Sequence, residues 1–161
     1  KTGYSKALGL ENLGVDEQRD NIILTDLYAA NIKTLSSGVI VRKASLQKNL
    51  ELTTNVLQAL IEGLAFVKSP THKSTVAKTL MQHLKISDPA VAEQGYRYLQ
   101  RDLDITLYPP VEGLQNLQRF MKAYNPRVGE VRVTDLVDDS VIRTLSESGF
   151  VDKTFSSYRI Q

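Results

Sequence analysis

The chain has 161 residues, of which 42% are hydrophobic and 24% are charged, values typical of a soluble globular domain. Its formal net charge is only +2, with 20 basic residues interspersed among 18 acidic ones, which argues against nucleic acid as a partner. The absence of cysteine excludes disulfides, zinc–thiolate sites and thiol nucleophiles.

The first 31 residues combine polar and short apolar patches. Three glycines and a charged run interrupt the first 20 residues, and we expect a short helix or a loop there. Ile22–Leu24 is a brief apolar run that predicts a buried strand. The chain starts at Lys1 without an initiator Met or a signal-peptide pattern, so we expect that processing or truncation has removed upstream residues.

The next segment, residues 32–42, contains a polar corner followed by the β-branched triplet Val39–Val41. This triplet predicts the clearest strand of the sequence. A single strand cannot satisfy its own backbone groups, so we expect it to pair with a sheet supplied by upstream chain.

Helical spacing dominates the sequence after that. A first helix is predicted from an N-cap at Ser45 to Val67, where Ser69-Pro70 stops the pattern, and a second over Lys73–Leu84. Asp88 and Pro89 are a strong start signal for a third helix.

Two more helices are expected toward the C-terminus. One should occupy Val111–Tyr124, between the prolines at 109–110 and Pro126. A short last helix should run through Val141–Leu145 and close at Gly149, with a polar, frayed tail beyond Asp152.

Three stretches carry a family resemblance in their order and spacing. They are a first motif at Ser37–Arg42 (SGVIVR), a second motif at Tyr108–Gln115 (YPPVEGLQ) and a third motif at Asp138–Asp152 (DDSVIRTLSESGFVD). A helix ending in Ala65–Lys68 lies between the first two. Together they resemble the C-terminal half of ABC-transporter substrate-binding proteins, and most closely the group of sulfonate- and nitrate-binding proteins and thiamine-pyrimidine synthases.

The resemblance implies an α/β fold of the type II periplasmic-binding-protein kind, with two lobes and a ligand cleft between them. The chain would be a partial one, dominated by C-terminal helices, with one or two strands. Residues 1–31 would end the second lobe, residues 32–43 would form the returning crossover strand and hinge, and residues 44–161 would be helices packing on the first lobe.

Six residues are candidate ligand contacts. The cluster Thr34, Ser36, Ser37 and Gly38 offers small hydroxyls and free backbone N–H groups for a sulfonate, a carboxylate or a pyrimidine edge, although it also suits a simple turn. Two more candidates lie just upstream. Tyr28 would stack on a planar ligand, or simply pack at a sheet edge, and Asp26 would pair with a cationic group, or cap a turn.

Other polar residues are given structural roles. His72 and His83 are too far apart in sequence for a helical metal pair, and we expect surface histidines and no metal or cofactor. Asp138 and Asp139, with Glu147, are expected to cap and solvate the last helix. Four tyrosines on helical faces or at helix ends are expected to be core or interface rings: Tyr96, Tyr98, Tyr108 and Tyr124.

The function implied is non-enzymatic. The protein would capture a small organic solute outside the cytoplasm, in the periplasm or its equivalent, and deliver it to an ABC permease in the membrane, as a monomer. The alternatives are an enzyme related to thiamine-pyrimidine synthases, whose cysteine-rich motif is absent here, and a helical protein-interaction module if the chain is full length.

Overall fold

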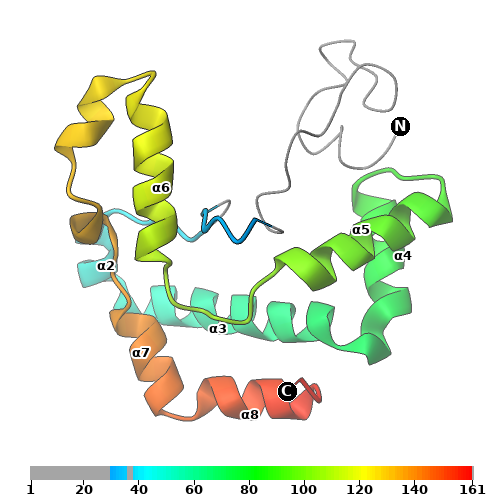
Figure 1. Cartoon of the computed structure of the whole chain (residues 1–161). Helices are drawn as coiled ribbons and strands as arrows, with labels where there is room; N and C mark the ends of the chain where they lie inside the picture. The colour runs from blue at the N-terminus through cyan, green and yellow to red at the C-terminus, as the bar shows by residue number, and fades with distance from the viewer. Residues whose placement is uncertain (1–29, 36–37, 161) are drawn as a thin grey trace. The chain divides into compact units, whose positions relative to one another are not determined.

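The computed structural model describes residues 30–35 and 38–160, and within these ranges the chain is mostly helical and forms no β-strand (Figure 1). The α-helical and 3₁₀-helical (η) elements are, in chain order, α2 Lys43–Lys48, α3 Leu50–Lys68, η2 Pro70–His72, α4 Lys73–His83, α5 Pro89–Asp102, α6 Val111–Lys122, η3 Pro126–Glu130, η4 Val133–Leu136, α7 Ser140–Glu147 and α8 Phe150–Ser157. The predicted strand at Ile22–Leu24 lies outside the described residues.

Contacts between elements divide the chain into two units. Among the described residues, the first unit contains Leu60–Ile105 and the chain from Asp152 onward, and the second contains residues up to Ala59 together with Thr106–Val151. Each unit is described by itself below. The expected division into second lobe, crossover and helical closing part stays a prediction.

The predicted strand at Val39–Val41 is wrong. These residues carry no strand pairing, and their exposed fractions are 50%, 94% and 46%, the largest being that of Ile40. β-Branched residues favour a strand because they fit a pleated surface against neighbours, and the described residues supply no partner strand. The α/β expectation therefore reduces, for this part of the chain, to an α-rich fold.

The first predicted helix is interrupted. Ser45 lies inside α2 instead of capping it, and the chain leaves helical geometry at Asn49 (φ −130°, ψ 48°). The carbonyl of Asn49 then accepts a hydrogen bond from the Thr53 N–H at 3.0 Å, which starts α3. Pro70 ends α3 as predicted, because the residue before a proline is driven to extended geometry, and Ser69 has ψ 121°.

In the first unit, α4 and α5 pack against each other (Figure 1). Asp88 caps α5 as predicted, accepting a hydrogen bond from the Ala90 N–H at 2.8 Å, with Pro89 in the first turn. Val76 on α4 and Tyr96 on α5 are buried. On the surface Lys73 pairs with Glu93 at 2.7 Å, and the hydrogen bond from Lys73 is the main reason why the pKa of Glu93 is lowered.

A reciprocal pair of hydrogen bonds ties the end of α3 to the end of α5. The Lys68 ammonium donates to the Gln100 carbonyl at 2.5 Å, and the Gln100 side-chain amide donates to the Val67 carbonyl at 2.6 Å. Partial burial lowers the pKa of Lys68, against the opposing charges of Asp104 and Asp102. One carbonyl in the last turn of each helix is thereby satisfied.

In the second unit, α6 packs against η3 and η4 (Figure 1). The Gln118 amide nitrogen donates to two carbonyls of the returning chain, those of Val128 at 2.8 Å and Val131 at 2.6 Å. Val133 is buried beside them in sequence. One side chain thus fixes the path of a loop that lacks an extended hydrogen-bond ladder of its own.

The C-terminal end is more ordered than expected. Gly149 has φ +75° and ends α7, which confirms the predicted left-handed position. The tail is not frayed, however, because α8 follows at once and buries Val151 and Thr154. In the first unit, Tyr158 also contacts the rings of Phe66 and His72 edge-on, at centroid distances of 6.3 and 5.6 Å.

Candidate functional site

Two of the six candidate ligand contacts lie among the described residues. Thr34 and Gly38 are exposed, and a Cβ added at Gly38 would meet no atom within 4 Å. The other four lie outside the described residues: Asp26, Tyr28, Ser36 and Ser37. The site can therefore be built from the backbone around Thr34.

The backbone at Thr34 lies directly against the first turn of α6. A Cβ built on Gly113 would be 3.0 Å from the Thr34 carbonyl carbon, 3.2 Å from its oxygen and 3.3 Å from the Leu35 nitrogen. These three atoms are backbone atoms, so the neighbour cannot yield by rotating a side chain. A side chain at position 113 would therefore push the backbone of this segment away by a few tenths of an ångström, whereas glycine allows the close approach.

A hydrogen bond from the next turn of α6 holds the same segment. The Asn116 side-chain amide donates to the Lys33 carbonyl at 3.0 Å. Prolines 109 and 110 set where α6 begins, since Pro110 is its N-cap in extended geometry and its carbonyl accepts from the Leu114 N–H at 3.0 Å. Gly113 and Asn116, three residues apart, consequently face the segment together.

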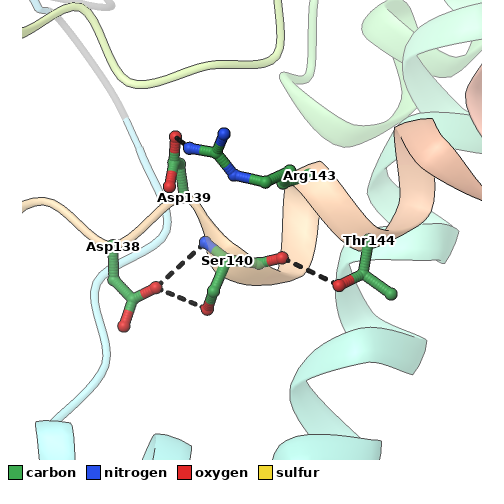
Figure 2. Close-up of polar contacts among 5 residues, drawn as sticks. All are labelled: Asp138, Asp139, Ser140, Arg143 and Thr144. Carbon is green, nitrogen blue, oxygen red and sulfur yellow. Dashed lines mark hydrogen bonds and ion pairs between the residues drawn. The ribbon is translucent and has the colours of Figure 1, made fainter.

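The acidic pair of the third motif makes only local contacts (Figure 2). Asp138 accepts hydrogen bonds from the Ser140 hydroxyl at 2.5 Å and from the Ser140 N–H at 3.0 Å, and these bonds lower the pKa of Asp138. Asp139 pairs with Arg143 at 2.6 Å and raises its pKa. The N-cap of α7 is Asp139, which makes no capping hydrogen bond with its side chain, whereas Asp138 accepts the N–H of the first helical residue. The predicted capping role therefore holds in part, and the helix concerned, α7, is not the last.

In the second unit, charged and polar groups from different motif regions also influence the pKa values of Asp138 and Arg143. Besides the two Ser140 hydrogen bonds, the charge of Lys43, one residue after the first motif, contributes to lowering the pKa of Asp138. Besides Asp139, Tyr108 at the start of the second motif contributes to raising the pKa of Arg143. Residues that flank the first motif on either side thus lie near the second motif and near Asp138 of the third, and Tyr108 of the second lies near Arg143 of the third.

The histidines form no metal site. Within the described part of the chain, no group of three His, Asp or Glu side chains could hold an ion. His72 is half-buried and stacks on Phe66 with ring centroids 4.0 Å apart, so it is a packing residue and not the surface histidine expected. His83 is exposed, as expected.

The four tyrosines have different environments. Tyr96 is 6% exposed and belongs to the core, as expected. Tyr98 and Tyr108 are about two-fifths exposed, with Arg101 over the ring of Tyr98 at 5.4 Å. Tyr124 is 80% exposed and is not a core ring, with the neighbouring ring of Phe120 at 5.7 Å.

An open hollow of about 310 Å³ lies in the first unit, beside the stacked ring of His72. Its lining consists of Thr71, His72, Ser157, Tyr158 and Arg159. The Thr71 hydroxyl is already hydrogen-bonded to that of Ser69 at 2.9 Å, and the Ser157 hydroxyl donates to the Thr154 carbonyl at 2.7 Å. These two hydroxyls are engaged within the protein, and the remaining polar groups of the lining belong to His72, Tyr158 and Arg159.

One described helix, α3, has the length and composition that a membrane span requires. Core helices of soluble proteins meet the same criterion, so this is weak evidence for a membrane location. Comparison of the chain with protein-family models, curated proteins and solved structures found no match.

The sequence analysis did not single out Gly113 and Asn116. A signal was available for Gly113, since a glycine in the first turn of a helix lowers helix propensity and often marks a close backbone approach. No local signal marks Asn116, because its acceptor lies 83 residues away in sequence.

Proposed function

We propose that the chain is the C-terminal portion of a two-lobed substrate-binding protein that captures a small organic solute and delivers it to an ABC permease. The solute class is a sulfonate, a nitrate-like anion or a pyrimidine. In this proposal residues 32–43 are the returning crossover and the later helices pack on the first lobe. Binding involves no chemical step and no cofactor.

The observation that carries the proposal is the meeting of the motif regions within one unit. The residues just before the first motif contact Gly113 of the second motif, and Lys43, just after the first, acts on Asp138 of the third. Regions that the resemblance relates only by their order along the chain are thus also near one another in one unit, which supports the proposal.

Exposed apolar side chains support a further packing partner. In the second unit, Ile40 is 94% exposed, Leu50 is 56% and Leu52 is 62%. Large apolar side chains left this exposed are candidates for burial against another part of the protein. The proposal places the first lobe over them.

The chemistry of the candidate cluster suits anions and polar heterocycles. The Thr34 hydroxyl is exposed, and in the proposal the hydroxyls of Ser36 and Ser37 and the backbone N–H of Gly38 extend the same set of donors. Tyr28 and Asp26 would add a ring face and a carboxylate for a pyrimidine. Closure of two lobes around the solute would then give affinity, with specificity set by these groups.

A thermal-shift screen of the full-length gene product tests this function. The probes are taurine, nitrate and a 4-aminopyrimidine, each with Thr34→Ala and with the control Thr75→Ala, an exposed threonine on α4. A probe at a hundred times its Kd stabilises the folded state by about 2.7 kcal/mol, which corresponds to a Tm rise of about 5 °C or more.

The results of this screen distinguish the three functional hypotheses. A rise with one probe class that Thr34→Ala reduces and Thr75→Ala preserves supports solute binding. No rise with any probe refutes it. In that case the exposed apolar side chains would favour a helical protein-interaction module, whereas formation of a pyrimidine product by the full-length protein would favour the enzyme.

A further inference from the structure

One turn of α6 is built around a segment from another part of the chain. Gly113 is buried, and its neighbours are the backbone atoms of Thr34 and Leu35. Asn116 holds the carbonyl of Lys33. The two contacts act on consecutive residues of one exposed segment that has no regular secondary structure.

We propose that Gly113 and Asn116 are positioning residues that fix the backbone of residues 33–35 and thereby set the affinity of the binding cleft; this rests on the function proposed above. Neither residue touches solute. They act through Thr34, which carries the one hydroxyl of the candidate cluster that lies among the described residues. Both contacts come from one face of α6, Asn116 at the Lys33 carbonyl and Gly113 at the Thr34 backbone.

The choice of residue types supports a positioning role. Glycine is the poorest helix former apart from proline, yet it occupies the third position of α6, where the helix gains nothing from its flexibility. Glycine at this position allows the backbone of α6 to lie close to the backbone of Thr34 and Leu35. Asn116 adds direction, because a side-chain amide donates along a defined line to one carbonyl oxygen.

Fixing a ligand-contacting segment before binding raises affinity, because the segment then loses less conformational entropy when the solute binds. The net contribution of one hydrogen bond, or of one displaced backbone contact, corresponds to a change of about threefold to tenfold in the dissociation constant. We expect this weakening for Gly113→Ala, whose Cβ must push the segment by a few tenths of an ångström, and for Asn116→Leu, which removes the donor.

Two variants serve as matched controls. Gln118→Leu loosens α6 from η3 and the following chain without a contact to residues 33–35, so it reproduces a loss of stability alone. Gly63→Ala makes the same chemical change as Gly113→Ala inside α3, where nothing lies within 4 Å. Both should leave the dissociation constant within twofold of the parent.

Two readouts are used on the full-length product. The first is calorimetric titration with whichever of taurine, nitrate or the 4-aminopyrimidine binds the parent protein. The second needs no solute: a nitroxide on Lys33→Cys, the only cysteine this chain would contain, reports the mobility of the segment. Gly113→Ala and Asn116→Leu should each increase label mobility and weaken binding, and the controls should do neither.

Unchanged label mobility in both α6 variants would overturn the positioning role. Increased mobility with an unaltered dissociation constant would overturn its link to affinity. If the parent protein binds none of the three probes, the proposed function fails and the affinity claim fails with it, while the label result still decides whether α6 fixes the segment.

Discussion

Substitution of Gly149 tests whether the third motif needs a left-handed backbone conformation at this position. It has φ +75°, and a Cβ added there would meet no atom within 4 Å, so Gly149→Ala should suffer only the conformational cost of a left-handed backbone. That cost is about 1–2 kcal/mol for an L-residue. Gly63→Ala makes the same change in open space inside a helix and should stabilise by about 0.5–1 kcal/mol.

The two variants should therefore differ by about 2 kcal/mol in free energy of unfolding, with opposite signs relative to the parent. In urea, with a slope of about 2 kcal/mol/M, this separates their unfolding midpoints by about 1 M. Circular dichroism at 222 nm follows the helices through the transition. Gly149→Asn should recover part of the loss, because asparagine tolerates left-handed geometry better than alanine.

A Gly149→Ala protein as stable as Gly63→Ala would refute this reasoning. So would an equal loss in the alanine and asparagine variants, since it would mean that a clash and not backbone geometry causes the loss.

Three further predictions concern other contacts. Asp88→Ala should lower the free energy of unfolding by about 1 kcal/mol through loss of its cap on α5, with Asp88→Asn close to the parent, as measured by urea denaturation. Gln118→Leu should cost about 1–3 kcal/mol in the same assay, because two carbonyls lose their donor. Because hydrogen bonds from Ser140 lower the pKa of Asp138, its contribution to stability is present above about pH 4 and is lost as the pH falls through the lowered pKa. Asp138→Asn should therefore show a smaller loss of stability between pH 5 and pH 2 than the parent, and an identical loss would contradict the assignment.

The helices were predictable where start and stop signals are local. Asp88 with Pro89, the Ser69-Pro70 break and Gly149 each act through their own backbone or that of a neighbour two residues away. Such signals do not depend on the rest of the fold. The interruption of the helix at Asn49 was missed because no such residue marks it.

Two errors have different physical origins. Val39–Val41 was expected to be a strand because of its side chains, but strand formation depends on a partner that this part of the chain does not contain. The tail was expected to fray because it looks polar. Its apolar and aromatic positions, Val151, Phe155 and Tyr158, nevertheless recur at helical spacing, and that period was the better signal.

The candidate site was predictable only in part. The hydroxyl-rich cluster follows from residue types, and Thr34 lies exposed as a ligand contact requires. Its support from Gly113 and Asn116 depends on contacts across roughly 80 residues, which composition and spacing do not encode.

The central claim is that this chain completes a solute-binding cleft, and the most direct measurement is calorimetric titration of the full-length product combined with small-angle scattering. The account predicts one site per chain for a sulfonate, nitrate or pyrimidine probe, weakened by Thr34→Ala, with a smaller radius of gyration on binding as the lobes close. Absence of heat with every probe, or binding without compaction and without any effect of Thr34→Ala, would contradict it.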